Sequence, residues 1–216
     1  MRPGIRSLNE LIITARTYFL DANVWLFYLL DLYLAEFGIS TLTHTQLHQK
    51  AYAPVVEQLL GEESVKIAFT PLLVSEIVNA FARKYAMRAY LLESGWAAAE
   101  LEKAHFKHHY RDTAYGRDHY RLSVKFITDN LASYIESGRL VVTELGFRNP
   151  EQAQYLVYNF KSSPASDFND YCYYELCLGD HPNQPWPLIT DDADFGFSDL
   201  EIYTLNPHLL QKGSSS

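Results

Sequence analysis

Short apolar runs and helical patterns follow one another along most of this chain, and their alternation restricts the fold more than any other feature. The β-prone runs are residues 17–21, 65–69, 140–145, 188–190 and 200–205. Apolar residues at helical spacing predict helices at 24–36, 47–60, from Thr70-Pro71 onward, 151–160 and 167–178. Strands that alternate with helices form parallel sheets covered on both faces. We therefore expect an α/β fold, a three-layer α/β/α sandwich with a mainly parallel central sheet.

The chain has the length and apolar content of one globular domain. Its 216 residues are 48% hydrophobic, which is enough for a sizeable core. We expect a single domain over 1–210 and a flexible tail at 211–216, and no apolar run reaches the roughly 18 residues of a membrane helix. Cys172 and Cys177 would lie about 7.5 Å apart along one helix and on different faces. We therefore expect no disulfide between them and a reducing, cytoplasmic setting.

The distribution of charge argues against one class of protein. With 18 basic and 26 acidic residues the chain sums to −8, whereas a plain electrostatic nucleic-acid binder is basic overall. Nine of the basic and five of the acidic residues lie between Arg83 and Lys125, so this stretch sums to +4 and the remainder to −12. An acidic chain remains compatible with a metal enzyme, because metal sites collect carboxylates.

Acidic residues fall where the predicted strands end. Asp21 ends the first strand, Asp192 and Asp194 follow the fourth, and Glu76 lies in the helix after the second strand. Asp170 is near the start of the helix at 167–178, and Asp167 lies one turn earlier, where it could instead cap that helix. In a parallel sheet the carboxyl ends of strands and the starts of the following helices share one edge, where ligand crevices open. Four segments would therefore bring carboxylates to one crevice.

Such a crevice needs positive charge. Like charges about 4 Å apart repel by roughly 4 kcal/mol per pair at an effective dielectric constant of about 20. Mg²⁺ and Mn²⁺ prefer oxygen ligands, and one or two such ions can hold a phosphodiester and lower the pKa of a bound water. The acids therefore predict a site for a divalent metal ion.

Four motifs carry these acids in order: YFLDANVWL, TPLLVSEIVNAFARK, SDFNDYCYYELC and LITDDADF. With them the chain resembles the PIN-domain ribonucleases, most closely the VapC-type toxins of bacterial toxin–antitoxin pairs. The resemblance covers 17–84 and 140–205. It implies a parallel α/β/α sandwich, cleavage of RNA phosphodiester bonds with Mg²⁺ or Mn²⁺, and an antitoxin protein as partner.

The resemblance also implies a role for each matching residue. Asp21, Asp170 and Asp192 would be the main metal ligands. Glu76 would bind the metal through water or help to activate the nucleophile, and Asp194 matches a further acid of the last motif. Asn23, Thr190 and Asp167 would orient these ligands. The catalytic set is thus Asp21, Glu76, Asp170 and Asp192.

One segment departs from the compact members of the family. At about 87–137 the chain has an extra helical insertion, which carries the basic and aromatic excess. One interpretation is an RNA-binding arm, with tyrosines stacking on bases and cations on phosphates. The other is a solvated helical hairpin with half-buried tyrosines. The candidate RNA-binding cations are Arg83, Lys84, Arg88, Lys107 and Arg111.

Two other functions stay open at this point. One is a PIN-like binding module that has lost activity, although all four expected acids are present. The other is a metal-dependent phosphohydrolase with Asp21 as nucleophile, whose usual second aspartate is replaced by Asn23. The helix that follows Asp21 is also apolar nearly all round. This predicts a second covering surface, either the insertion or a homodimer interface.

Overall fold

The computed structural model describes residues 4–37, 46–97, 106–143, 150–161, 167–179, 185–197 and 199–214. Its centre is one six-stranded sheet in the order β1-β6-β5-β2-β3-β4, in which every pair of neighbours is parallel. The strands are β1 (Gly4–Ser7), β2 (Thr17–Leu20), β3 (Lys66–Phe69), β4 (Leu140–Val142), β5 (Leu188–Ile189) and β6 (Glu201–Thr204). The predicted α/β fold with a parallel sheet is confirmed.

The order of the strands reverses beside β2. From β2 the chain continues to β3 and β4 on one side, and it then returns to β5 and β6 on the other. In open parallel sheets the crevice that holds a ligand opens at such a reversal, at the carboxyl ends of the strands. Asp21, Thr70 and Thr190 directly follow β2, β3 and β5 at this edge, and all three are buried.

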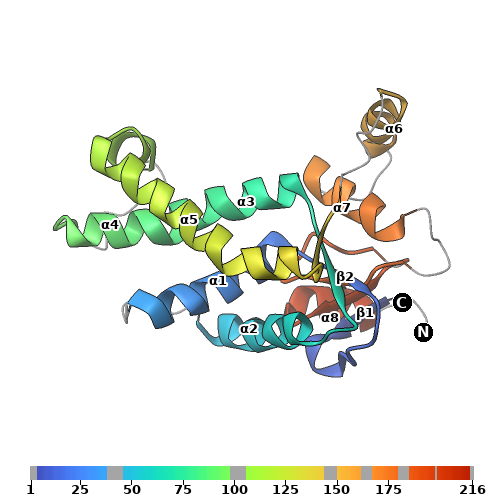
Figure 1. The fold of residues 1–216 in the computed structure, drawn as a ribbon. Helices are drawn as coiled ribbons and strands as arrows, with labels where there is room; N and C mark the ends of the chain where they lie inside the picture. Colours follow the sequence, from blue (N-terminus) through green and yellow to red (C-terminus); the bar gives the residue numbers. More distant parts are fainter. Residues whose placement is uncertain are drawn as a thin grey trace.

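Helices cover both faces of the sheet. They are α1 (Ala22–Phe37), α2 (Gln46–Gly61), α3 (Pro71–Phe81), α6 (Pro150–Phe160), α7 (Phe168–Leu178) and α8 (Pro207–Ser214). Figure 1 shows α3 and α7 above the sheet and α2 below it. Two helices begin where the sequence predicts: the Thr70 side chain accepts from Leu73 N at 3.0 Å, and Asp167 accepts from Asp170 N at 2.9 Å. Among the described residues, no helix has the length and apolar character needed to cross a bilayer.

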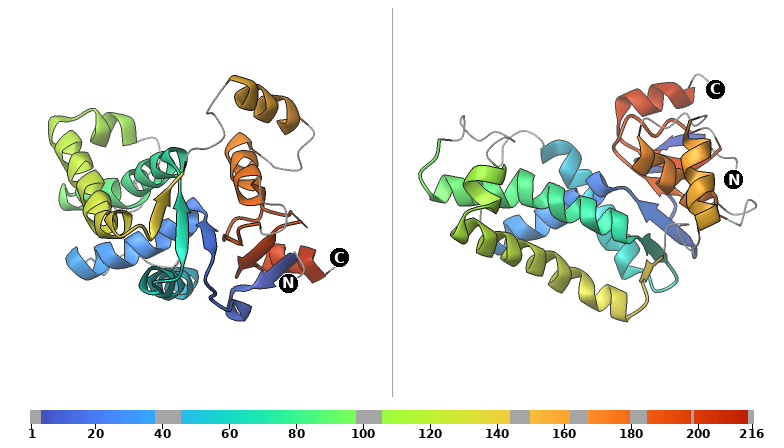
Figure 2. Two further views of the ribbon diagram at one scale, coloured as in Figure 1. Left: turned by 45° about the vertical axis from the view of Figure 1, so that its right-hand side comes forward. Right: turned by 90° about the horizontal axis from the view of Figure 1, so that it is seen from above.

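The insertion is a helical hairpin that extends α3 (Figures 1 and 2). Helix α3 continues through a π-helical turn, η2 (Ala82–Ala86), into α4 (Met87–Glu93), and the chain returns through η4 (Phe106–Arg111) and α5 (Ala114–Glu136). The ring of Tyr33 on α1 meets Phe81 and Phe126 edge to face, each at 5.3 Å between centroids. The hairpin therefore covers α1, which accounts for the second apolar surface of that helix.

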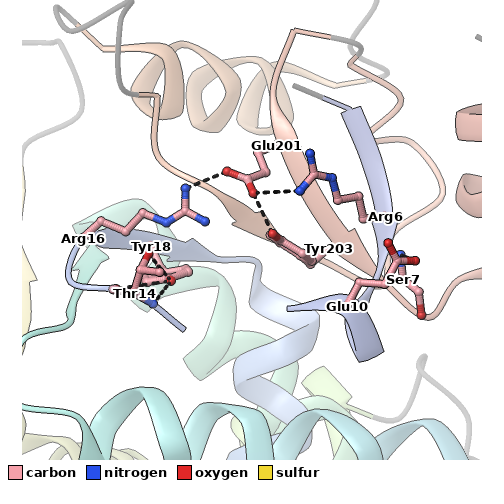
Figure 3. A network of polar contacts seen from close by, with 8 residues as sticks. All are labelled: Arg6, Ser7, Glu10, Thr14, Arg16, Tyr18, Glu201 and Tyr203. Atoms are coloured by element: carbon pink, nitrogen blue, oxygen red, sulfur yellow. Dashed lines mark hydrogen bonds and ion pairs between the residues drawn. The ribbon is translucent and has the colours of Figure 1, made fainter. Parts of the chain in front are cut away.

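A charge network joins three strands toward their amino-terminal ends (Figure 3). Glu201, at the start of β6, accepts a hydrogen bond from Arg16 at 2.6 Å and one from the Tyr203 hydroxyl at 2.6 Å. Arg6 on β1 pairs with the same carboxylate at 3.5 Å. Burial raises the pKa of Glu201, but the hydrogen bonds and the two guanidinium groups outweigh it and lower the pKa. The network ties β1 and β2 to β6.

Two elements were not predicted. Strand β1 pairs with β6 at the sheet edge, and α8 packs against β1. The predicted flexible tail at 211–216 is wrong for 211–214, which belong to α8, while 215–216 lie outside the described residues. Asn206 accepts from His208 N at 3.0 Å, and Leu209 is fully buried, so α8 is capped and anchored. Cys172 and Cys177 are buried free thiols, as predicted.

Candidate active site

Asp21 is the centre of the candidate site. It directly follows β2, beside β5, and it is only 5% exposed. Its Oδ1 accepts from Ala22 N at 2.6 Å, and its Oδ2 accepts from Thr190 Oγ1 at 3.1 Å and from Asn23 Nδ2 at 3.4 Å. Burial and the charges of Asp192 and Glu76 raise the pKa of Asp21 to about 7, although the hydrogen bonds oppose the shift. The carboxylates of Asp21, Asp192 and Glu76, which come from separate segments of the chain, are therefore close enough for the charges of the other two to act on Asp21.

Thr190 connects Asp21 to Asp192. Its hydroxyl donates to Asp21 and accepts from Asp192 N at 2.9 Å, so the Thr-x-Asp spacing produces a local turn. Asp192 is half-buried, and its Oδ1 accepts from Asp194 N at 3.0 Å. Asp194 itself is exposed. Thr190 and Asn23 both contact Asp21, and Asp194 lies at the rim of the site.

Glu76 is held by the helix opposite it. One carboxylate oxygen accepts from Asn169 Nδ2, and the other accepts from the Tyr173 hydroxyl at 2.6 Å. Both donors are on α7, and neither was among the predicted site residues. Asn169 and Tyr173 are spaced i, i+4, so the sequence alone places them on one helix face beside Asp170. The run YCYYELC hides this signal, because it has the pattern of an ordinary buried helix face.

Asp170 and Asp167 lie at the start of α7 but have different surroundings, and the effect of Asp170 is seen on Tyr173. Burial and the hydrogen bond to Glu76 raise the pKa of Tyr173, and the charges of Asp21 and Asp170 add to this effect. Asp170 therefore lies within electrostatic reach of the same tyrosine as Asp21 and Glu76. Asp167 is exposed and caps α7. Its position thus corresponds to the capping interpretation rather than to contact with the other acids.

Of the predicted basic residues, Lys84 has the clearest link to the acids. Partial desolvation and Arg83 lower the pKa of Lys84, while the charges of Asp21 and Asp192 act in the opposite direction. Arg83 donates to the carbonyl of Asn79 at 3.2 Å.

The other three basic candidates lie further along the hairpin. Arg88 is twelve residues past Glu76 along the α3–α4 rod, or about 18 Å. Arg111 is on η4 and pairs with exposed Asp112 at 3.0 Å. The side chain of Lys107 lies outside the described residues.

The acids have the chemistry of a metal site but do not converge on one point. In the part of the chain that the structure describes, no three His, Cys, Asp or Glu side chains come close enough together to hold a metal ion. Their oxygens are nevertheless the donors that Mg²⁺ and Mn²⁺ prefer, and each carboxylate has about four lone-pair sites with which to accept hydrogen bonds or bind a cation. The donor set therefore fits a divalent ion by its chemistry.

A scan against protein-family models and searches of the curated proteins and the solved structures found no match to this chain. The likeness to PIN-domain ribonucleases therefore depends on the four sequence motifs.

Proposed function

We propose that this protein is a divalent-metal-dependent endoribonuclease of the PIN type, which acts at the carboxyl-terminal ends of β2 and β5. One observation carries the proposal: Asp21 is buried beside Thr190, and its burial, together with the charges of Asp192 and Glu76, raises its pKa to about 7. Burying a carboxylate near other carboxylates costs stability. Strongly shifted carboxyl groups in such positions are typical of functional sites.

The residues that would hold Mg²⁺ or Mn²⁺ are Asp21, Asp170 and Asp192, with Glu76 beside them and Asp194 at the rim. When bound, the ion supplies polarisation of the phosphate and a bound water of lowered pKa. Thr190 and Asn23 fix the direction of the Asp21 carboxylate. Because the pKa of Asp21 is raised to about 7, a cation that binds this carboxylate must compete with a proton.

The position and charge of Lys84 favour a substrate that is an anion. No ion pair joins Lys84 to a carboxylate among the described residues, and the fields of Asp21 and Asp192 reach it. An acidic nuclease needs local positive charge to attract the RNA backbone. If the protein is also a VapC-type toxin, its antitoxin would block the crevice with an Arg or Lys in place of the metal charge.

The test is cleavage of mixed structured and single-stranded RNAs with Mn²⁺, Mg²⁺ or EDTA. We expect metal-dependent cutting that falls by at least about 100-fold in Asp21→Asn. Asp191→Asn is the matched control, because Asp191 accepts from the Tyr52 hydroxyl at 2.9 Å and an asparagine retains that acceptor. Equal cutting by wild type and Asp21→Asn would refute the proposal. Neither cutting nor Mn²⁺ binding would favour the inactive binding module.

A further inference from the structure

Helix α7 supplies more to the site than its own acid. Asn169 and Tyr173 are four residues apart, so they project from the same face of α7. Each donates to a different oxygen of the Glu76 carboxylate, and the Tyr173 contact is 2.6 Å long. Glu76 is on α3, more than 90 residues earlier in the chain. The two donors therefore fix which way an acid of another helix points.

Tyr173 contacts two other elements of the site, β2 and α3. Its ring packs on Phe19 of β2, with 5.0 Å between centroids, and Asp21 follows two residues later. Its hydroxyl reaches Glu76 of α3, and the side chain is 1% exposed. Because the ring is enclosed, the hydroxyl cannot swing away to another partner. One side chain thus ties the position of Glu76 to the strand that carries Asp21.

We infer that Asn169 and Tyr173 are positioning residues, which hold the Glu76 carboxylate in the site with Asp21. The inference rests on the proposed metal-dependent function of that site. Two hydrogen bonds occupy two of the roughly four lone-pair sites of a carboxylate, so Glu76 can still face a cation or a water molecule. Groups that orient the ligands of a metal in this way typically contribute 10- to 100-fold to metal affinity or activity.

The competing explanation is that these contacts only join α3 to α7. The two explanations differ in what the Tyr173 hydroxyl does, because the ring already packs on Phe19 without it. Tyr173→Phe keeps the ring and removes only the donor to Glu76. A structural role predicts a lower melting temperature with unchanged Mn²⁺ affinity, whereas a positioning role predicts weaker Mn²⁺ binding.

The experiment uses the full chain and four variants. Mn²⁺ affinity is measured by titration, the melting temperature by heating in EDTA, and kcat and KM on the RNA that wild type cuts best. The variants are Tyr173→Phe, Glu76→Gln, both together, and Tyr174→Phe. Tyr174→Phe is the matched control, because the Tyr174 hydroxyl on the same helix donates to Asp199 and not to Glu76.

We expect Tyr173→Phe to weaken Mn²⁺ binding by about 10-fold and to lower kcat by a similar factor, with KM within about 2-fold of wild type. In the Glu76→Gln background, Tyr173→Phe should have little further effect, because the hydroxyl acts through that carboxylate. Tyr174→Phe should leave Mn²⁺ affinity unchanged.

Each other outcome decides a different question. Unchanged Mn²⁺ affinity in Tyr173→Phe overturns the inference, whatever happens to its melting temperature. Weaker Mn²⁺ binding in Tyr173→Phe, in a protein that cuts no RNA, supports the positioning role and refutes the nuclease. A wild type that binds no Mn²⁺ overturns both.

Discussion

Replacing Asp21 with asparagine should make the protein more stable above neutral pH. In the fold the pKa of Asp21 is raised from 3.8 to about 7, mainly by burial and then by Asp192. Between those pH values the folded chain retains a proton that the unfolded chain has lost. Stability therefore falls as pH rises from about 4 to about 7, and it stays low above that. A shift of about three pKa units corresponds to roughly 4 kcal/mol of lost stability, as an upper limit.

Asparagine should recover most of this loss. Its oxygen can accept from Ala22 N, and its amide can donate to Thr190 Oγ1, which now donates to Asp21. The exchanged hydrogen bonds cost about 1–2 kcal/mol. The net gain at pH 8 is then about 2–3 kcal/mol, or roughly 5–10 °C in melting temperature for a domain of this size. At pH 4 Asp21 is protonated in the fold, so the gain should disappear.

The assay is thermal melting of wild type, Asp21→Asn and Asp191→Asn in EDTA from pH 4 to pH 9. Asp191 is half-buried and holds the Tyr52 hydroxyl, so its replacement tests whether any nearby asparagine stabilises the chain. We expect the Asp21→Asn advantage to grow through pH 5–7 and the Asp191 variant to show no such trend. An equal advantage at pH 4 and pH 8, or none at pH 8, would refute the electrostatic reasoning.

Two further predictions concern the substrate and the sheet. Lys84→Gln should reduce kcat/KM on RNA several-fold and make kcat/KM less dependent on salt concentration. Arg111→Gln should change kcat/KM little, because Arg111 is already paired with Asp112. A larger loss in Arg111→Gln than in Lys84→Gln would instead place the RNA at the tip of the hairpin. Arg16→Gln should destabilise the fold by about 1–3 kcal/mol at pH 7, because Glu201 remains buried with one fewer partner. The pKa of Glu201 is lowered in the fold, so the stability difference between wild type and Arg16→Gln should be complete above pH 4.5 and should shrink as the pH falls through the folded pKa of Glu201. Melting curves that show the same difference at pH 7 and at pH 3 would exclude the ion pair as its source.

The sequence predicts the parts of this protein that depend on neighbours along the chain. Thr70 and Asp167 begin their helices because a cap needs only the next three residues, and Thr190 reaches Asp192 N for a similar reason. Strand β1 is only four residues long, and its pairing with β6 is set by contacts almost 200 residues apart. The contact between Tyr173 and Glu76 also joins residues far apart in the chain, 97 positions from each other. Periodicity identifies a buried face but not the side chain it will meet.

The hairpin connects the insertion to the acidic site through one continuous helical rod. It begins as a continuation of α3, so Glu76 and Lys84 lie on one rod. In a regular α-helix a residue eight positions later is rotated by about 80° around the axis. The π-helical turn at Ala82–Ala86 has more residues per turn, so it rotates Lys84 back toward the face of Glu76. A substitution that restores regular α-helix there should therefore move Lys84 away from the acids, although it changes no acidic residue.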